Sequence, residues 1–175
     1  MAQTVLHQFG LCTGIVLLLA NGVGYGQAAA SPWRIQIADP IRANLVRRIL
    51  DEAARLLADD TCRTLLSEFH DQRGRPLAER LDAMGTDIQT YMSWILFTNE
   101  MGSRACALDA HAVSMPGSRV VHICDTQIER NWRQNPPQVV AAYIHEILHS
   151  LGLGENPPSS SYITERVMDR CKPGR

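Results

Sequence analysis

The chain has 175 residues, with 17 Lys and Arg against 18 Asp and Glu and a formal net charge of −1 at pH 7. It contains no run of basic or acidic residues, so the charge pattern gives no support to binding of nucleic acid or of an anionic membrane surface. Its length suffices for one domain of ordinary size and is too short for two.

The first thirty residues contain no Lys, Arg, Asp or Glu. An apolar stretch from Leu11 to Ala20 leads into a glycine-containing segment and then into Gln27-Ala28-Ala29-Ala30. This order is typical of a secretory signal peptide with a small-residue cleavage site near Ala28 or Ala30. A membrane anchor is the alternative, but the apolar stretch is short for a span and is followed by glycines. We expect residues 1–30 to be a cleaved signal and residues 31–175 to form one secreted or periplasmic domain without a membrane span.

Outside the expected signal, the chain has four cysteines: Cys62, Cys106, Cys124 and Cys171. An even number of cysteines in an oxidising compartment predicts two disulfides, and three pairings stay open. A zinc site made of four cysteines is the alternative, but the sequence lacks the Cys-x-x-Cys spacing of such sites.

Helices are predicted first along the domain. Asp39-Pro40 begins an amphipathic helix, and a second short helix is expected from Thr61. A third segment should run from Leu77 to Met84 and stop at Gly85. Seven residues at helical spacing form the expected core face of the first helix: Ile41, Leu45, Val46, Ile49, Leu50, Leu56 and Leu57.

The middle of the domain has the pattern of strands. Tyr91–Phe97 is rich in aromatic and aliphatic residues and predicts a strand. Ala112–Ser114 and Arg119–Cys124 flank a four-residue segment with Pro and Gly, which predicts a hairpin. His111 and His122 have no motif partner here, so we expect ordinary strand or loop residues.

A longer helix is expected next, with Asn135 as its N-cap, Pro136 as its first residue and Gly152 just beyond its end. It contains His145-Glu146-Ile147-Leu148-His149. Two imidazoles at i and i+4 share one helix face and can bind one metal ion, while the intervening glutamate can act on a water molecule as general base. The alternative is a buried helix with two hydrogen-bonded histidines and no metal.

A catalytic zinc ion takes three protein ligands, and two glutamates could supply the third. Glu155 lies six residues after His149, where Gly152 can turn the chain back. Glu165 lies in a helix expected from about Ser161 to Cys171. There Ile163, Val167 and Cys171 share the core face, and Glu165 and Asp169 point away from it. We therefore favour Glu155.

The stretch from His145 to Glu155 reads His-Glu-Ile-Leu-His-Ser-Leu-Gly-Leu-Gly-Glu. It resembles the zinc-binding consensus of the metzincin metallopeptidases, in which a glycine follows the second histidine by three residues and the third ligand follows that glycine by three. Its Ser-Leu-Gly-Leu part is most similar to the matrix metalloproteinases. Glu155 departs from the consensus histidine and from the aspartate of snapalysin-type enzymes.

This resemblance implies a zincin-type fold, with the motif helix under a small sheet whose edge strand binds extended peptide. Metzincins also have a methionine turn beneath the zinc. Met168 is the downstream candidate, but we expect it to pack in the core of the last helix. Glu165 followed by Asp169 resembles the pattern of thermolysin-like enzymes at a shorter spacing.

Helices, a small mixed sheet with a hairpin, a motif helix and a short last helix predict an α+β, zincin-like single domain. The function that we expect is that of a monomeric, secreted zinc-dependent endopeptidase acting on peptides or proteins. His145, His149 and Glu155 would bind Zn²⁺, Glu146 would be the catalytic base, and the substrate would add to a strand edge at Arg119–Cys124. The alternative is a secreted zinc-binding or interaction protein of the same fold without turnover.

Overall fold

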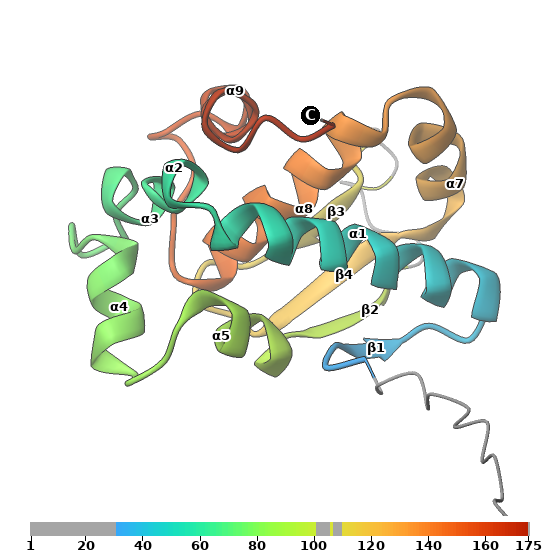
Figure 1. The fold of residues 1–175 in the computed structure, drawn as a ribbon, viewed down its shortest axis with the longest axis horizontal. Coiled ribbons are helices and arrows are strands. Elements are labelled where there is room, and N and C mark those ends of the chain that lie inside the picture. Colours follow the sequence, from blue (N-terminus) through green and yellow to red (C-terminus); the bar gives the residue numbers. More distant parts are fainter. Residues whose placement is uncertain (1–30, 101–105, 107–109, 175) are drawn as a thin grey trace, which may run out of the picture. The chain divides into compact units, whose positions relative to one another are not determined.

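The computed structural model describes residues 31–100, 106 and 110–174. In this part of the chain, helices and a small mixed sheet make an α+β fold, as predicted (Figure 1). Residues Ser31–Arg175 cluster into one compact unit. In chain order the elements are β1 (Arg34–Gln36), α1 (Pro40–Ala58), α2 (Asp60–Arg63), α3 (Leu65–Glu68), α4 (Leu77–Ala83), α5 (Ile88–Trp94), β2 (Leu96–Glu100), β3 (Ala112–Ser114), β4 (Val120–Cys124), α7 (Asp125–Gln134), α8 (Pro136–Ser150) and α9 (Ser160–Cys171).

The sheet has the strand order β1-β2-β4-β3. Strand β2 pairs in parallel with both β1 and β4, whereas β3 and β4 form the predicted antiparallel hairpin, in which Ser114 lies opposite Val121. Strand β4 is therefore interior, and the expectation that Arg119–Cys124 offers a free edge is wrong. The strand at the edge of the sheet beside β4 is β3.

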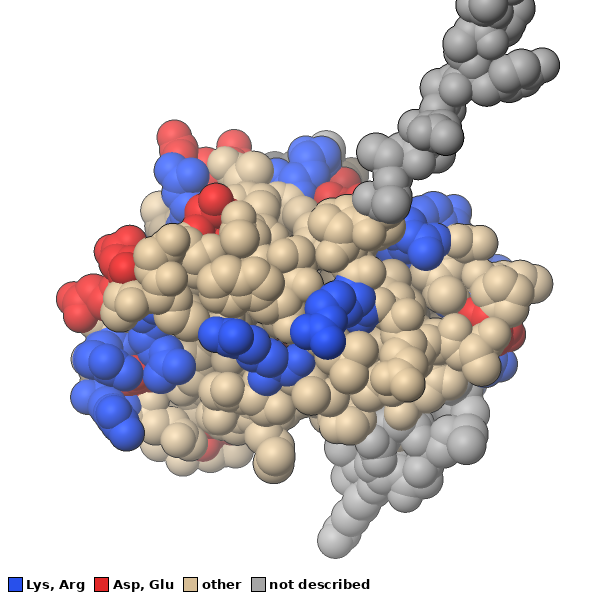
Figure 2. Space-filling view, turned by 90° about the horizontal axis from the view of Figure 1, so that it is seen from below, with Lys and Arg blue, Asp and Glu red and all other residues tan. Residues whose placement is uncertain are grey.

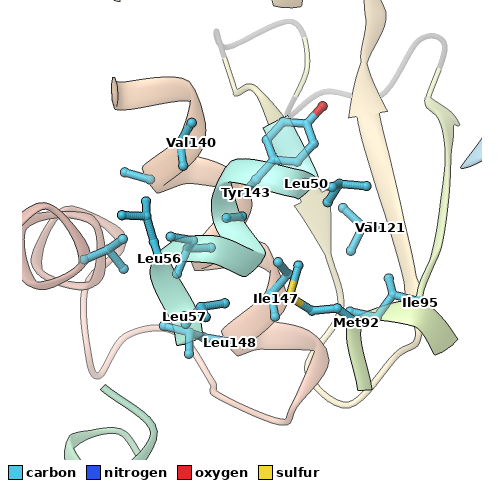
Figure 3. Packing of buried hydrophobic residues seen from close by; sticks show 14 of the residues in the cluster. Leu50, Leu56, Leu57, Met92, Ile95, Val121, Val140, Tyr143, Ile147 and Leu148 are labelled. Carbon is cyan, nitrogen blue, oxygen red and sulfur yellow. The ribbon is translucent and has the colours of Figure 1, made fainter. Parts of the chain in front are cut away.

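Helices α1 and α8 pack against each other and against the sheet, and their apolar faces form the core (Figure 1). Figure 3 shows side chains from α1, α5, β4 and α8 meeting there, among them Leu50, Met92, Val121 and Tyr143. In β4 the side chains of Val121 and Ile123 are buried and face this core, as alternate residues of a strand do.

Helix α1 begins where the sequence predicts. The Asp39 side chain accepts a hydrogen bond from the backbone N–H of Ile41 at 2.8 Å, as an N-cap does. Six of the seven expected core residues are buried, but Ile41 is 71% exposed. The first turn of the helix extends past the core, so helical periodicity alone misplaces this residue.

The strand predicted at Tyr91–Phe97 is wrong over its first half. Those residues belong to helix α5, whose N-cap Asp87 accepts a hydrogen bond from the backbone N–H of Thr90 at 2.7 Å. Ile88, Tyr91 and Met92 are buried at i, i+3 and i+4, which is helical spacing. The strand β2 starts only at Leu96.

Two disulfides join elements that are distant in sequence. Cys62 of α2 is bonded to Cys171 at the end of α9, and Cys106 is bonded to Cys124 at the end of β4. The expectation of two disulfides is confirmed, and the structure supplies the pairing.

The charged residues agree with the near-neutral balance of the sequence. On the face in Figure 2, most of the surface is uncharged, and Lys and Arg side chains lie in several separate groups rather than in one continuous band. None of the helices in residues 31–100 and 110–174 combines the length and the apolar character needed to cross a bilayer.

Candidate metal centre

Helix α8 carries the His-Glu-x-x-His motif, and its ends are set by local sequence. The Asn135 side chain accepts a hydrogen bond from the backbone N–H of Gln138, and Pro136 occupies the first turn. After the last turn, Gly152 has φ of +112°, a backbone conformation that residues other than glycine rarely adopt. The helix therefore ends at Ser150, one residue beyond the second motif histidine.

The two motif histidines lie side by side on one face of α8, as predicted. Their Nε2 atoms are 2.8 Å apart, and both side chains are almost fully buried. Burial, together with the neighbouring His149, lowers the pKa of His145 to about 4, so this imidazole is neutral near pH 7. A neutral imidazole is the form that binds a metal ion.

The outer ring nitrogens are held by the protein. His149 donates a hydrogen bond from Nδ1 to the backbone carbonyl of Leu153 at 2.7 Å, which leaves a lone pair on its Nε2. Nδ1 of His145 shares a hydrogen bond with the hydroxyl of Thr164 on α9, at 3.0 Å. Two Nε2 atoms turned toward each other need a proton or a cation between them.

Glu155 completes the group from the loop after α8. Its Oε1 atom lies 3.7 Å from Nε2 of His145 and 3.7 Å from Nε2 of His149. The point equidistant from these three atoms lies about 2.0 Å from each, within the range of zinc–nitrogen and zinc–oxygen bonds. The three residues can therefore hold a metal ion.

The turn that brings Glu155 to the histidines is braced by the segment after α3. Asp71 pairs with Leu153 in an isolated β-bridge, and the backbone N–H of Gln72 donates to the carbonyl of Gly152 at 3.2 Å. A Cβ atom at Gly152 would lie 3.3 Å from the Cβ of Asp71, so the close approach also requires glycine.

Asp71 is itself a buried carboxylate. It accepts hydrogen bonds from the backbone N–H groups of Arg73 and Arg75 and from the Arg75 guanidinium. These bonds hold the pKa of Asp71 well below its usual range. An ionised Asp71 therefore stabilises the segment that pairs with Leu153, two residues before Glu155.

The other candidate ligand lies outside the group. Glu165 is exposed on α9, whereas Ile163 and Val167 on the opposite face are buried, as the helical pattern predicts. Met168 packs against the core, which confirms the expectation for this residue. Across residues 31–100, 106 and 110–174, the group of His145, His149 and Glu155 is the only set of three such side chains that could hold an ion, so His111 and His122 lie apart from it.

Glu146 lies between the two histidines in sequence and is half-buried. Burial raises the pKa of its carboxyl group to about 8, and the nearby Glu155 carboxylate acts in the same direction. The hydroxyl of Ser114 opposes this shift by donating to Oε2 of Glu146 at 2.8 Å. The Glu155 carboxylate is therefore near enough to Glu146 to disfavour its ionisation.

Ser114 and Thr164 are two contacts that the sequence does not reveal. Ser114 precedes Glu146 by 32 residues, and Thr164 follows His145 by 19. Neither hydroxyl belongs to a motif, so only the packing of the hairpin and of α9 against α8 brings them to the site. The nearest sequence signal is the predicted hairpin, which ends its first strand at Ser114.

Comparison of the chain with protein families, with curated proteins and with solved structures finds no match.

Proposed function

We propose that the chain is a secreted zinc-dependent endopeptidase with a zincin-like fold. One observation carries the proposal: Nε2 of His145, Nε2 of His149 and Oε1 of Glu155 converge within 3.7 Å of one another, and the half-buried Glu146 lies on the same helix as the two histidines. Two imidazoles and one carboxylate leave a fourth position of a tetrahedral zinc site open, as hydrolytic zinc sites do.

His145, His149 and Glu155 would hold the zinc ion. When bound, zinc lowers the pKa of a water molecule and polarises a carbonyl group. The hydrogen bonds to Leu153 and Thr164 orient the two imidazoles before a metal arrives, so little freedom is lost on binding.

Glu146 would act as the catalytic base. Its carboxylate accepts a proton from the attacking water and returns the proton to the leaving amine. A raised pKa makes a carboxyl group a better proton acceptor than an exposed glutamate is, which suits this role near neutral pH.

The substrate would lie along β3. This strand pairs with β4 on one side, and its other side has no strand partner among the described residues. An extended peptide can add to such an edge through main-chain hydrogen bonds. Because Ser114 of β3 contacts Glu146, a peptide on this edge passes close to the proposed base.

A non-catalytic secreted zinc-binding protein is the second candidate. It is favoured by the limited exposure of the two histidine side chains, which are only 5% and 6% accessible. Restricted access leaves less room for a substrate carbonyl than a widely open site would.

The test combines zinc stoichiometry with cleavage of a peptide library. We expect one zinc ion per chain in the wild type and in Glu165→Ala, and its loss in Glu155→Ala. Glu165→Ala is the matched control, since it removes a carboxylate outside the group.

Glu146→Gln should keep the zinc and lose about 10²–10⁴-fold in cleavage rate, because the amide cannot accept the proton. Cleavage that survives this change refutes the mechanism. Zinc retained by a wild type that cleaves nothing supports the second candidate instead.

A further inference from the structure

The end of the edge strand is fastened to the motif helix at the proposed base. The Ser114 hydroxyl lies 2.8 Å from Oε2 of Glu146 and 3.1 Å from the backbone oxygen of the same residue. Ser114 is the last residue of β3, so one side chain links the strand edge to the centre of helix α8.

A second bond holds the same hairpin in place. The backbone N–H of Gly117 donates to the carbonyl of His149 at 2.8 Å. Gly117 has φ of +81°, which allows the chain to turn there without strain. The hairpin is thus attached to α8 at Glu146 and again at His149, which keeps Ser114 within reach of Glu146.

The contact matters because a glutamate side chain has three rotatable torsions and can point its carboxylate in several directions. Within the described residues, Ser114 is the only residue that hydrogen-bonds the Glu146 carboxylate. A hydroxyl that donates to Oε2 restricts the orientation of the carboxylate.

We propose that Ser114 is a positioning residue, which holds the Glu146 carboxylate so that Oε1 faces the attacking water. This inference rests on the proposed peptidase function. It also couples the two parts of the site, since the strand that would bind the peptide backbone directly orients the base. A peptide bound to β3 and the Glu146 carboxylate would then both be positioned by the same strand.

The test compares Ser114→Ala, Ser114→Thr and Ser118→Ala in the zinc-loaded full domain. Ser114→Ala removes the donor, and Ser114→Thr keeps a hydroxyl on a side chain that strands tolerate well. Ser118→Ala is the matched control, because Ser118 lies at the other end of the hairpin loop and its hydroxyl accepts from the Val120 N–H.

We expect Ser114→Ala to lower kcat about 10–100-fold, which is the usual effect of removing a hydrogen bond that orients a residue of a metal site. The KM should stay within about twofold of wild type. Ser114→Thr should restore most of the rate, and Ser118→Ala should match wild type. Zinc stoichiometry should be the same in all four proteins. An unchanged kcat in Ser114→Ala, or a loss of zinc in parallel with activity, overturns the positioning role.

An infrared measurement reads the contact without turnover. The carboxyl band of Glu146, assigned by its loss in Glu146→Gln, should shift in Ser114→Ala and stay in place in Ser118→Ala. A band that does not shift refutes the inference about Ser114. A band that shifts in Ser114→Ala while the zinc-loaded wild type cleaves no peptide refutes instead the peptidase function on which the inference rests.

Discussion

The residues of the candidate metal centre are oriented by hydrogen bonds to other elements of the fold. His149 is oriented by a carbonyl in the loop after α8, His145 by a hydroxyl on α9, and Glu146 by a hydroxyl on β3. An imidazole with one bonded nitrogen has a defined tautomer and ring plane, so the other nitrogen is aimed before a ligand arrives. Zinc affinity should therefore depend on residues that never touch the ion.

The first prediction at this scale concerns Thr164. Replacing Thr164 by Val keeps the shape of the side chain and removes the hydroxyl that contacts Nδ1 of His145. We expect the zinc dissociation constant to rise about 10–100-fold, measured by competition with a chromophoric chelator. Thr164→Ser, which retains the hydroxyl, should bind zinc nearly as the wild type does; equal affinity of Val and Thr would contradict the orienting role.

The second prediction concerns Asp71 and acid stability. Because the pKa of Asp71 is lower in the folded protein than in the unfolded chain, its ionised form stabilises the fold. This stabilisation is complete above the unfolded pKa of about 3.9 and disappears as the pH falls through the lower, folded value. Asp71→Asn should thus unfold more easily than wild type at pH 7, and the difference should shrink below about pH 4.

Thermal unfolding followed by circular dichroism from pH 3 to pH 7 measures this difference. Asp82→Asn is the control, because Asp82 is exposed and should change stability little at any pH. A gap between Asp71→Asn and wild type that stays constant down to pH 3 would argue against the ionised state as its source.

Elements are positioned by their caps as much as by their apolar faces. Helix α8 carries both histidines and Glu146, and its N-cap Asn135 is followed by two prolines. A helix with a fixed start places residues ten positions later at a fixed rotation. The cap therefore contributes to where the histidines point.

Removing this cap gives a prediction for the element. Asn135→Ala should lower the free energy of unfolding by about 1 kcal/mol, within a range of about 0.5–2, because the Gln138 N–H loses its acceptor. Urea denaturation measures the loss. Gln134→Ala should change stability by no more than about 0.5 kcal/mol, since its side chain is exposed and makes no hydrogen bond among the described residues.

The accuracy with which each element could be predicted depends on whether its bounds are set by local residues or by distant partners. Helix α8 and helix α1 have caps, stops and long apolar faces, so the sequence alone predicts their bounds closely. Helix α7 has only two large apolar residues, Ile128 and Trp132; they lie one turn apart, but a single such pair is too short a pattern to predict the helix. Strand β1 has three residues and exists through its pairing with β2, which no local pattern can reveal.

The candidate site shows the same division. His145 and His149 are one turn apart on one helix, so their proximity follows from helical geometry. Glu155 was favoured because Gly152 can turn the chain, and the structure brings its carboxylate to both rings. The expectation of a free edge at Arg119–Cys124 is wrong, because the position of β4 inside the sheet depends on its parallel partner β2, which comes from a distant segment.

At the scale of the whole molecule, the two disulfides close loops of very different length. Cys62 and Cys171 are 109 residues apart, and Cys106 and Cys124 are 18 apart. A longer loop restricts the unfolded chain more, so its closure should stabilise the fold more.

Replacing each pair by alanine tests this expectation. Loss of the Cys62–Cys171 bond should cost about 4–5 kcal/mol and loss of the Cys106–Cys124 bond about 3 kcal/mol, as measured by urea denaturation. Equal losses, or a larger loss for the short loop, would show that effects other than loop closure dominate.

The bond between Cys62 and Cys171 has a practical consequence for testing the proposed peptidase activity. A single cut anywhere between these two cysteines leaves both fragments in one covalent molecule. Self-digestion in that region would escape a non-reducing gel, and the pieces would separate only after a thiol is added. Samples compared with and without reductant therefore reveal whether a preparation has nicked itself.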